Sequence, residues 1–276
     1  MKHLYTIILS FSAFITLAGG WVQPKNNGYF QLSQRLLVAD QIFKDWSETV
    51  DFRTLSNYTT SFYGEYGLND KFTLVTDVPL FVRNTLNAEV NGNTGETINE
   101  GISFNSFGDI DLALKYGLKT EGSLVMNVGL FLGLPTGSTN SSSNIPLPTG
   151  DGEFNQMVKI EAGYGFNSPV YLVGGLGYNN RTKGFSDDVR YDLELGFANK
   201  FLFRIKVSGI KSTFNGDDSF SSTALFSNNV EHMTYNPEIG YIHDDKYGAS
   251  LGIAGGNGRN VHAAPYFTFS LFMKVK

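Results

Sequence analysis

Hydrophobic and polar residues alternate with a period of two along most of the chain beyond residue 45. In a β-strand, successive side chains point to opposite faces, so such a segment has one apolar face and one polar face. Residues 189–197 are typical: Tyr191, Leu193 and Leu195 share one face, while Asp192 and Glu194 share the other. Similar alternation occupies residues 109–118, 123–135, 200–208 and 263–275. The pattern predicts antiparallel β-strands.

The length of these segments distinguishes between two all-β architectures. Strands of soluble sandwiches are typically about 5–6 residues long, whereas a tilted strand needs roughly 9–11 residues to cross a bilayer. The alternating segments of this chain reach the longer range, and their apolar faces carry almost no charge. The pattern therefore favours a membrane-embedded barrel over a soluble sandwich.

Short and long connections alternate between the predicted strands. Apolar-Gly-apolar steps precede short polar turns near residues 69, 119, 167, 198 and 244, and longer Gly-, Ser- and Asn-rich stretches occupy 41–56, 84–104, 136–152, 180–187, 212–228 and 257–262. The predicted strands are 28–40, 57–68, 71–83, 105–118, 123–135, 153–166, 169–180, 187–197, 200–211, 229–241, 247–257 and 261–275. This layout predicts an all-β fold: a 12-stranded transmembrane antiparallel up-and-down β-barrel with short periplasmic turns and longer extracellular loops.

The N-terminus has the pattern of a secretory signal peptide. Lys2 supplies a positive charge, residues 4–17 are mostly apolar, and small residues follow from Ala18. The apolar stretch is too short for a transmembrane anchor. We therefore expect a signal peptide over residues 1–18, cleaved after Ala18, and a single outer-membrane barrel domain over residues 19–276. About nine residues would then precede the first strand, so we expect no N-terminal plug.

Composition narrows the range of functions. The mean hydropathy of −0.13 excludes a polytopic helical membrane protein, and the absence of Cys excludes a disulfide scaffold, a Cys-ligated zinc site and a thiol nucleophile. A net charge of −5 argues against a nucleic-acid partner. Tyr and Phe make up most of the 14% aromatic content. Their positions predict two aromatic girdles, and the one beside the short periplasmic turns is better defined. No cofactor is expected.

Short Gly-rich motifs connect the chain to a known family. Residues 108–116 (Gly-Asp-Ile-Asp-Leu-Ala-Leu-Lys-Tyr) and 132–137 (Leu-Gly-Leu-Pro-Thr-Gly) resemble outer-membrane proteins of the MetA-pathway-of-phenol-degradation family, and so do 148–152 and 171–178. The resemblance covers roughly residues 105–200. It implies a barrel transporter that takes up small hydrophobic or aromatic compounds. The expected partners are therefore outer-membrane lipids, the barrel-assembly machinery and a small organic permeant.

Charged residues of the polar faces are expected to line the lumen. The candidates are Asp109, Asp111, Lys115, Lys159, Glu161, Arg190, Asp192, Glu194, Arg204 and Lys206. One interpretation is a constriction that selects permeants by charge. The other is a mutually neutralising lattice that fills a narrow barrel, and the sequence does not choose between them. The polar loop 136–152 is the candidate for an infolded plug, with an ordinary surface loop as the alternative.

Two other functions remain open at this point. A barrel enzyme that acts on lipid needs a Ser, a His base and an orienting group near the bilayer, and no Ser-containing motif accompanies the histidines. His232 and His262 are expected to point inward near the extracellular rim, which makes them a weak candidate pair for metal or proton binding. A structural or adhesive barrel without conductance is the other alternative. No catalytic residues are predicted.

Overall fold

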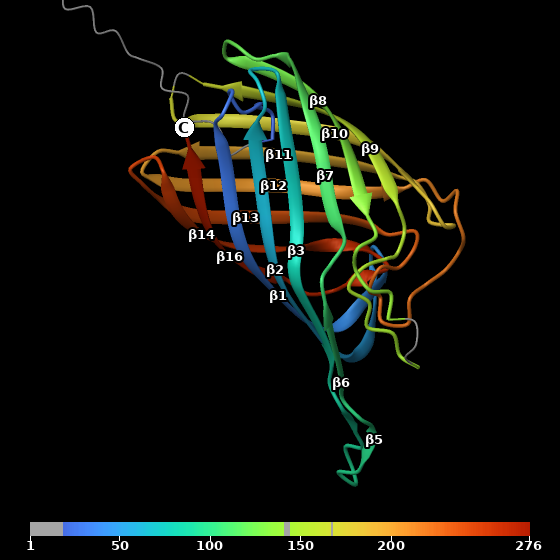
Figure 1. Ribbon diagram of the computed structural model, residues 1–276. Helices are drawn as coiled ribbons and strands as arrows, with labels where there is room; N and C mark the ends of the chain where they lie inside the picture. Colours follow the sequence, from blue (N-terminus) through green and yellow to red (C-terminus); the bar gives the residue numbers. More distant parts are fainter. Residues whose placement is uncertain (1–18, 141–143, 167) are drawn as a thin grey trace, which may run out of the picture.

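Twelve long strands form a closed antiparallel barrel (Figure 1). The computed structural model describes residues 19–140, 144–166 and 168–276; the predicted signal peptide lies outside them. The strands of the wall are β1 (Gly28–Asp45), β2 (Glu48–Gly67), β3 (Phe72–Leu86), β7 (Ile110–Lys119), β8 (Leu124–Leu134), β9 (Asn155–Gly165), β10 (Val170–Arg181), β11 (Asp188–Ala198), β12 (Phe201–Ser212), β13 (Glu231–His243), β14 (Tyr247–Arg259) and β16 (Tyr266–Val275). Pairing of β1 with both β2 and β16 closes the ring, so the predicted 12-stranded barrel is confirmed.

Four short strands belong to the extracellular side. β6 (Ile102–Ser106) extends the pairing with β3, and β15 (Val261–His262) extends the pairing with β1. β4 (Glu89–Val90) and β5 (Thr97–Asn99) form a separate hairpin, which projects away from the barrel at the lower end in Figure 1. Within the described part of the chain, no helix has the length and apolar character needed to span a membrane.

The loop predicted over residues 41–56 is wrong. β1 and β2 instead continue as a paired ribbon to a tight turn at Trp46 and Ser47. This end of the ribbon lies beyond the apolar belt, so nothing requires one of its faces to be apolar. Backbone pairing, with irregularities near Ala39 and Phe43, holds it as strand without the alternation on which the prediction depended. Part of the stretch 84–104 is strand for the same reason.

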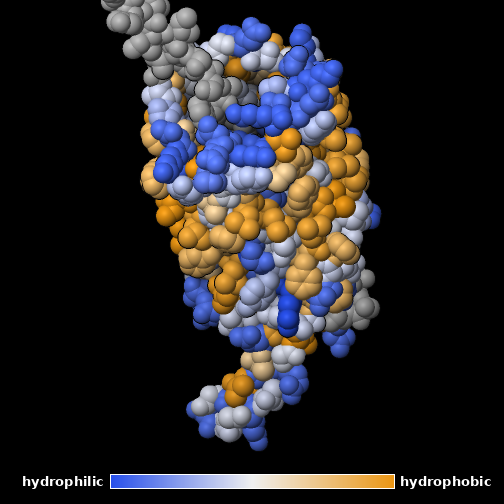
Figure 2. Space-filling model, turned by 60° about the vertical axis from the view of Figure 1, so that its left-hand side comes forward, coloured by the Kyte–Doolittle hydropathy of each residue, from blue (hydrophilic) through white to orange (hydrophobic). Residues whose placement is uncertain are grey.

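Exposed apolar side chains occur on every strand of the outer wall, and on the face shown in Figure 2 they form an apolar belt, orange, across the middle of the molecule. Leu193 and Leu195 are about half exposed, whereas Glu194 between them is 7% exposed because it faces inward. A surface of this size suits hydrocarbon rather than water. Ring pairs lie beside the periplasmic turns, such as Phe72–Tyr116 with centroids 5.0 Å apart and Tyr164–Phe166 at 4.9 Å. These rings occupy the positions predicted for the periplasmic girdle.

Candidate functional site: the barrel lumen

The segment from Gly19 to Gln23 lies inside the periplasmic end of the lumen, and residues 24–27 connect it to β1. Trp21 packs edge-on against Tyr171 with 6.2 Å between ring centroids. Asn127 donates hydrogen bonds of 3.0 Å to the carbonyl groups of Gly19 and Gly20. The expectation that this stretch is too short for a plug is wrong, because nine extended residues reach about 30 Å. That length is enough to turn back from β1 into the mouth of the barrel.

Gln23 joins this segment to the wall. Its backbone N–H donates to Thr73 Oγ1 at 2.7 Å, and its side-chain Nε2 donates to Glu65 Oε2 at 2.7 Å. Gln23 is 1% exposed and Thr73 is fully buried. Beyond Gln23, the N–H of Asn26 donates to the Gly67 carbonyl at 2.9 Å, so the segment leaves the lumen at the periplasmic end of β2.

Five charged side chains around the segment form one continuous network across β2, β7, β9 and β11. Lys115 Nζ lies 3.6 Å from Glu65 and 2.9 Å from Glu161. Lys159 Nζ lies 3.0 Å from Glu161 and 2.5 Å from Asp192. All five side chains are nearly buried, at 13% exposure or less. Charges buried at this level are stable only when paired and hydrogen-bonded, so at this end the network holds the wall and the N-terminal segment together.

The neighbouring strands continue the same polar packing. Tyr171 donates a hydrogen bond of 2.8 Å to Glu194. Arg204 donates to both carboxylate oxygens of Glu238, at 2.9 and 2.8 Å. Lys206, two residues further along β12, contributes its positive charge beside Asp192. Paired charges and aromatic rings therefore line the periplasmic end of the lumen.

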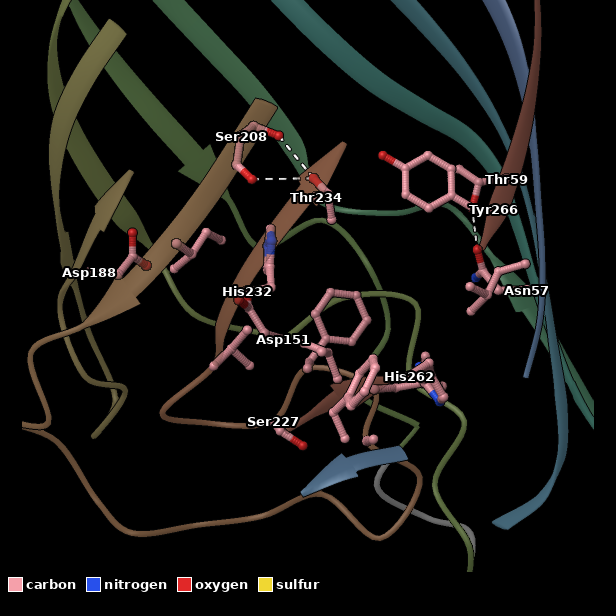
Figure 3. A pocket seen from close by; sticks show the side chains of 18 of the residues that line it. Asn57, Thr59, Asp151, Asp188, Ser208, Ser227, His232, Thr234, His262 and Tyr266 are labelled. Carbon is pink, nitrogen blue, oxygen red and sulfur yellow. Dashed lines mark hydrogen bonds between the residues drawn. The ribbon is translucent and has the colours of Figure 1, made fainter. Parts of the chain in front are cut away.

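The extracellular half of the lumen instead encloses a cavity of about 670 Å³ (Figure 3). Its wall carries charges of both signs: the acids include Asp109, Asp111, Asp151 and Asp188, and the bases include Arg35, Arg181 and Arg190. Apolar side chains of the loop between β12 and β13, Ala224, Leu225 and Phe226, also line it. Asp77 on β3 and Asp111 on β7 occupy directly opposed positions in the register. Arg190 is paired with Asp188 at 2.8 Å.

Asp109 has a structural role that explains the short Gly-rich motifs. Its Oδ1 accepts a hydrogen bond of 2.8 Å from the Gly137 N–H, and its Oδ2 accepts one of 2.8 Å from the Asp151 N–H. A Cβ on Gly150 would collide with the Asp109 carboxylate. Thr136 Oγ1 donates to the Gly108 carbonyl at 2.8 Å. The motifs near residues 108, 136 and 150 therefore form one clasp, which joins the start of β7 to both ends of the loop 136–152.

The described parts of that loop lie against the cavity. Leu147 is 1% exposed and packs with Leu55, Leu86 and Leu225. Asn84 Nδ2 donates to the Pro148 carbonyl at 2.6 Å, and the Thr223 hydroxyl donates to the Pro146 carbonyl at 3.2 Å. Two loops, 136–152 and the one between β12 and β13, thus meet over the extracellular mouth.

Asp151, near the end of the loop 136–152, has a shifted pKa. Burial raises the pKa of its carboxyl group to about 6.

The lumen contains the two candidate histidines and also residues that the sequence did not single out. His232 and His262 both line the cavity, on β13 and β15 (Figure 3), and no cluster of three metal-ligating side chains occurs within the described ranges. Trp21, Tyr171 and the loop between β12 and β13 were not singled out. The alternation did contain one signal for the positions of Trp21 and Tyr171. The inward positions Gly163 and Gly196 lack side chains, which leaves space for a ring beside each of them. Trp21 fills the first space and Tyr171 the second.

Comparison with known proteins supports the architecture. No protein-family model matches the chain, and no curated protein matches it. Among solved structures, it is similar to the COG4313 outer membrane channel from Pseudomonas putida F1, with a TM-score of 0.66 and 10% identity over 94% of this chain and 98% of that chain. It is also similar to the NanC porin, with a TM-score of 0.52 and 9% identity over 88% of this chain and all of the other. At these identities the likeness shows the fold.

Proposed function

We propose that this chain forms a narrow channel in the bacterial outer membrane, which admits small organic molecules from the extracellular side. The observation that carries the proposal is the division of the lumen. A cavity of about 670 Å³ faces the extracellular loops, and a constriction built from Trp21 and the buried charge network follows it. A binding space in series with a narrow passage is an arrangement that selects permeants by size and charge.

Small hydrophobic or aromatic compounds are the permeants that this lining favours. Leu37, Phe43, Val82, Phe226 and Tyr266 supply apolar and aromatic surface to the same cavity that the arginines and aspartates line. Pockets for small ligands combine apolar walls with a few polar groups that fix orientation. The resemblance of the Gly-rich motifs to barrels associated with aromatic catabolism supports the same substrate class.

Conductance in planar bilayers tests the channel, and swelling of proteoliposomes tests the permeant. We expect small single-channel currents, and faster swelling with a phenol-sized aromatic solute than with a disaccharide. A heat-denatured sample is the control for leakage. Absence of both conductance and solute entry from a correctly folded barrel would contradict the proposal. Release of fatty acid from the liposomes would favour the lipid-hydrolysing alternative.

A further inference from the structure

The first described residues of the chain pack closely against the wall of the lumen. A Cβ on Gly19 would lie 2.6 Å from Oε1 of Glu161, and a Cβ on Gly20 would lie 2.7 Å from the backbone nitrogen of Gly163. Real Cβ atoms do not approach other atoms this closely. Signal-peptide processing calls for small residues before the cleaved bond, but it does not explain two glycines after it. The backbone of the wall explains Gly20, because a Cβ there would collide with Gly163. Opposite Gly19 lies the movable end of the Glu161 side chain.

The groups around Gly19 hold its position on both sides. Lys115 Nζ donates to the Gly19 carbonyl at 3.2 Å, and Asn127 Nδ2 donates to the same oxygen at 3.0 Å. On the other side lies the Glu161 carboxylate, which is 5% exposed. Because N and Cβ of one residue are about 2.5 Å apart, the nitrogen of Gly19 lies within about 5 Å of Glu161 Oε1.

The Glu161 carboxylate retains the capacity for a further donor. Its Oε1 accepts a hydrogen bond from Lys159 at 3.0 Å. Its Oε2 is paired with Lys115 Nζ at 2.9 Å. A carboxylate has about four acceptor sites, and the two lysines use two of them, so the buried Glu161 carboxylate has room for one more donor.

We propose that the Ala18–Gly19 bond is hydrolysed during export and that the new α-ammonium group of Gly19 binds the Glu161 carboxylate inside the lumen. Water adds across the peptide bond, so that Ala18 leaves with the carboxylate and Gly19 keeps the amine, which takes up a proton. A peptidase of the exporting membrane supplies the catalysis. Cleavage of the signal peptide thus creates the ammonium group that donates to Glu161. The new N-terminus then anchors the segment that forms the periplasmic constriction. This inference requires export of the chain but not conduction through it.

The first test is the N-terminus of barrel purified from outer membranes. Edman degradation and intact mass are expected to give Gly-Gly-Trp as the first residues. A mature chain that begins at any other residue would overturn the proposal. This result is independent of conductance, so it separates the proposal from the proposed channel function.

The second test measures the reactivity of the Gly19 amine in the folded barrel. Acylation by an N-hydroxysuccinimide ester at pH 8, followed by mass spectrometry, reports the free amine. An opposite charge within about 6 Å favours the unreactive ammonium form, so we expect acylation about tenfold slower in the folded wild type than in Glu161→Gln. Glu121→Gln, at an exposed acid in a periplasmic turn, is the matched control and should react at the wild-type rate.

A second variant leaves Glu161 in place, in case Glu161→Gln does not fold. One glycine inserted between Ala18 and Gly19 moves the amine one residue away from the carboxylate. Acylation of this amine should be as fast as in Glu161→Gln. Heat-dependent mobility on gels checks that the barrel of the insertion variant is folded. Equal protection of the amine in the wild type and in the insertion variant would overturn the proposal.

Discussion

The two halves of the lumen differ in how they use the same residue types. At the periplasmic end, Glu161 contacts both Lys115 and Lys159, and the three side chains are buried against the N-terminal segment. At the extracellular end, Asp111, Arg35 and Arg190 line an open cavity of about 670 Å³. Inward charges therefore have two uses in one barrel. At the periplasmic end, inward glycines let the N-terminal segment approach the wall, and the charged side chains there are packed in a lattice. At the extracellular end, loops cover a cavity, and the charged side chains face that cavity.

Removal of the Trp21 ring should change the periplasmic half most. Trp21→Ala opens the space beside Gly163 and Tyr171, so single-channel conductance should rise several fold in planar bilayers. Trp21 is only partly buried, so its truncation should cost less than the roughly 3–5 kcal/mol of a fully buried Trp. Trp46→Ala, in the extracellular turn of the β1–β2 ribbon, is the control. Unchanged conductance in Trp21→Ala would place the constriction elsewhere.

Loss of the central lysine tests the buried network. Lys115→Met leaves Glu65 and Glu161 without their shared cation. Breaking a buried pair in this way costs about 3–5 kcal/mol, which should lower the temperature at which the barrel loses its folded mobility on gels. Lys119→Met, on the same strand but exposed, should have almost no effect. If the network does not stabilise the barrel, both variants should show the same unfolding temperature on gels.

The clasp at Asp109 belongs to the extracellular half. Asp109→Ala removes the acceptors for the Gly137 and Asp151 amides, at a cost of about 1–3 kcal/mol. We expect limited proteolysis to cut within residues 136–152 while the barrel stays intact. Asp218→Ala, at an exposed acid of another loop, should leave the cleavage pattern unchanged. Resistance of the loop in Asp109→Ala would show that Leu147 and the hydrogen bonds to the carbonyl groups of Pro146 and Pro148 hold it without the clasp.

The smallest expected effect is a pH dependence of the ion selectivity that the cavity gives the channel. Burial raises the pKa of Asp151 to about 6, so this carboxyl group takes up a proton as the pH falls from 7.5 to 5 and the cavity wall loses one negative charge. The cation-to-anion permeability ratio, from reversal potentials, should fall more in the wild type than in Asp151→Asn. The variant carries every other titrating group, so an identical fall in both would exclude a contribution from Asp151.

Much of the fold was predictable because a membrane wall imposes a simple rule on its strands. Inward and lipid-facing residues alternate along β11. The apolar Leu193 and the charged Glu194 therefore show which face is which, without knowledge of the neighbouring strands. The same rule fails beyond the apolar belt. Around Gln41 and Val50, no hydrocarbon selects one face, and the sequence of a paired ribbon looks like that of a loop.

The sequence by itself determined the number of strands, the position of the short turns and the side of the wall on which each charge lies. These properties follow from local alternation, and a closed sheet is the arrangement that satisfies the backbone in hydrocarbon. Only the tertiary structure decided which charges meet, since Lys115 and Glu161 lie on strands joined through β8. It also decided where the N-terminal segment lies, because the space that accepts Gly19 and Trp21 exists only after the wall has closed around it.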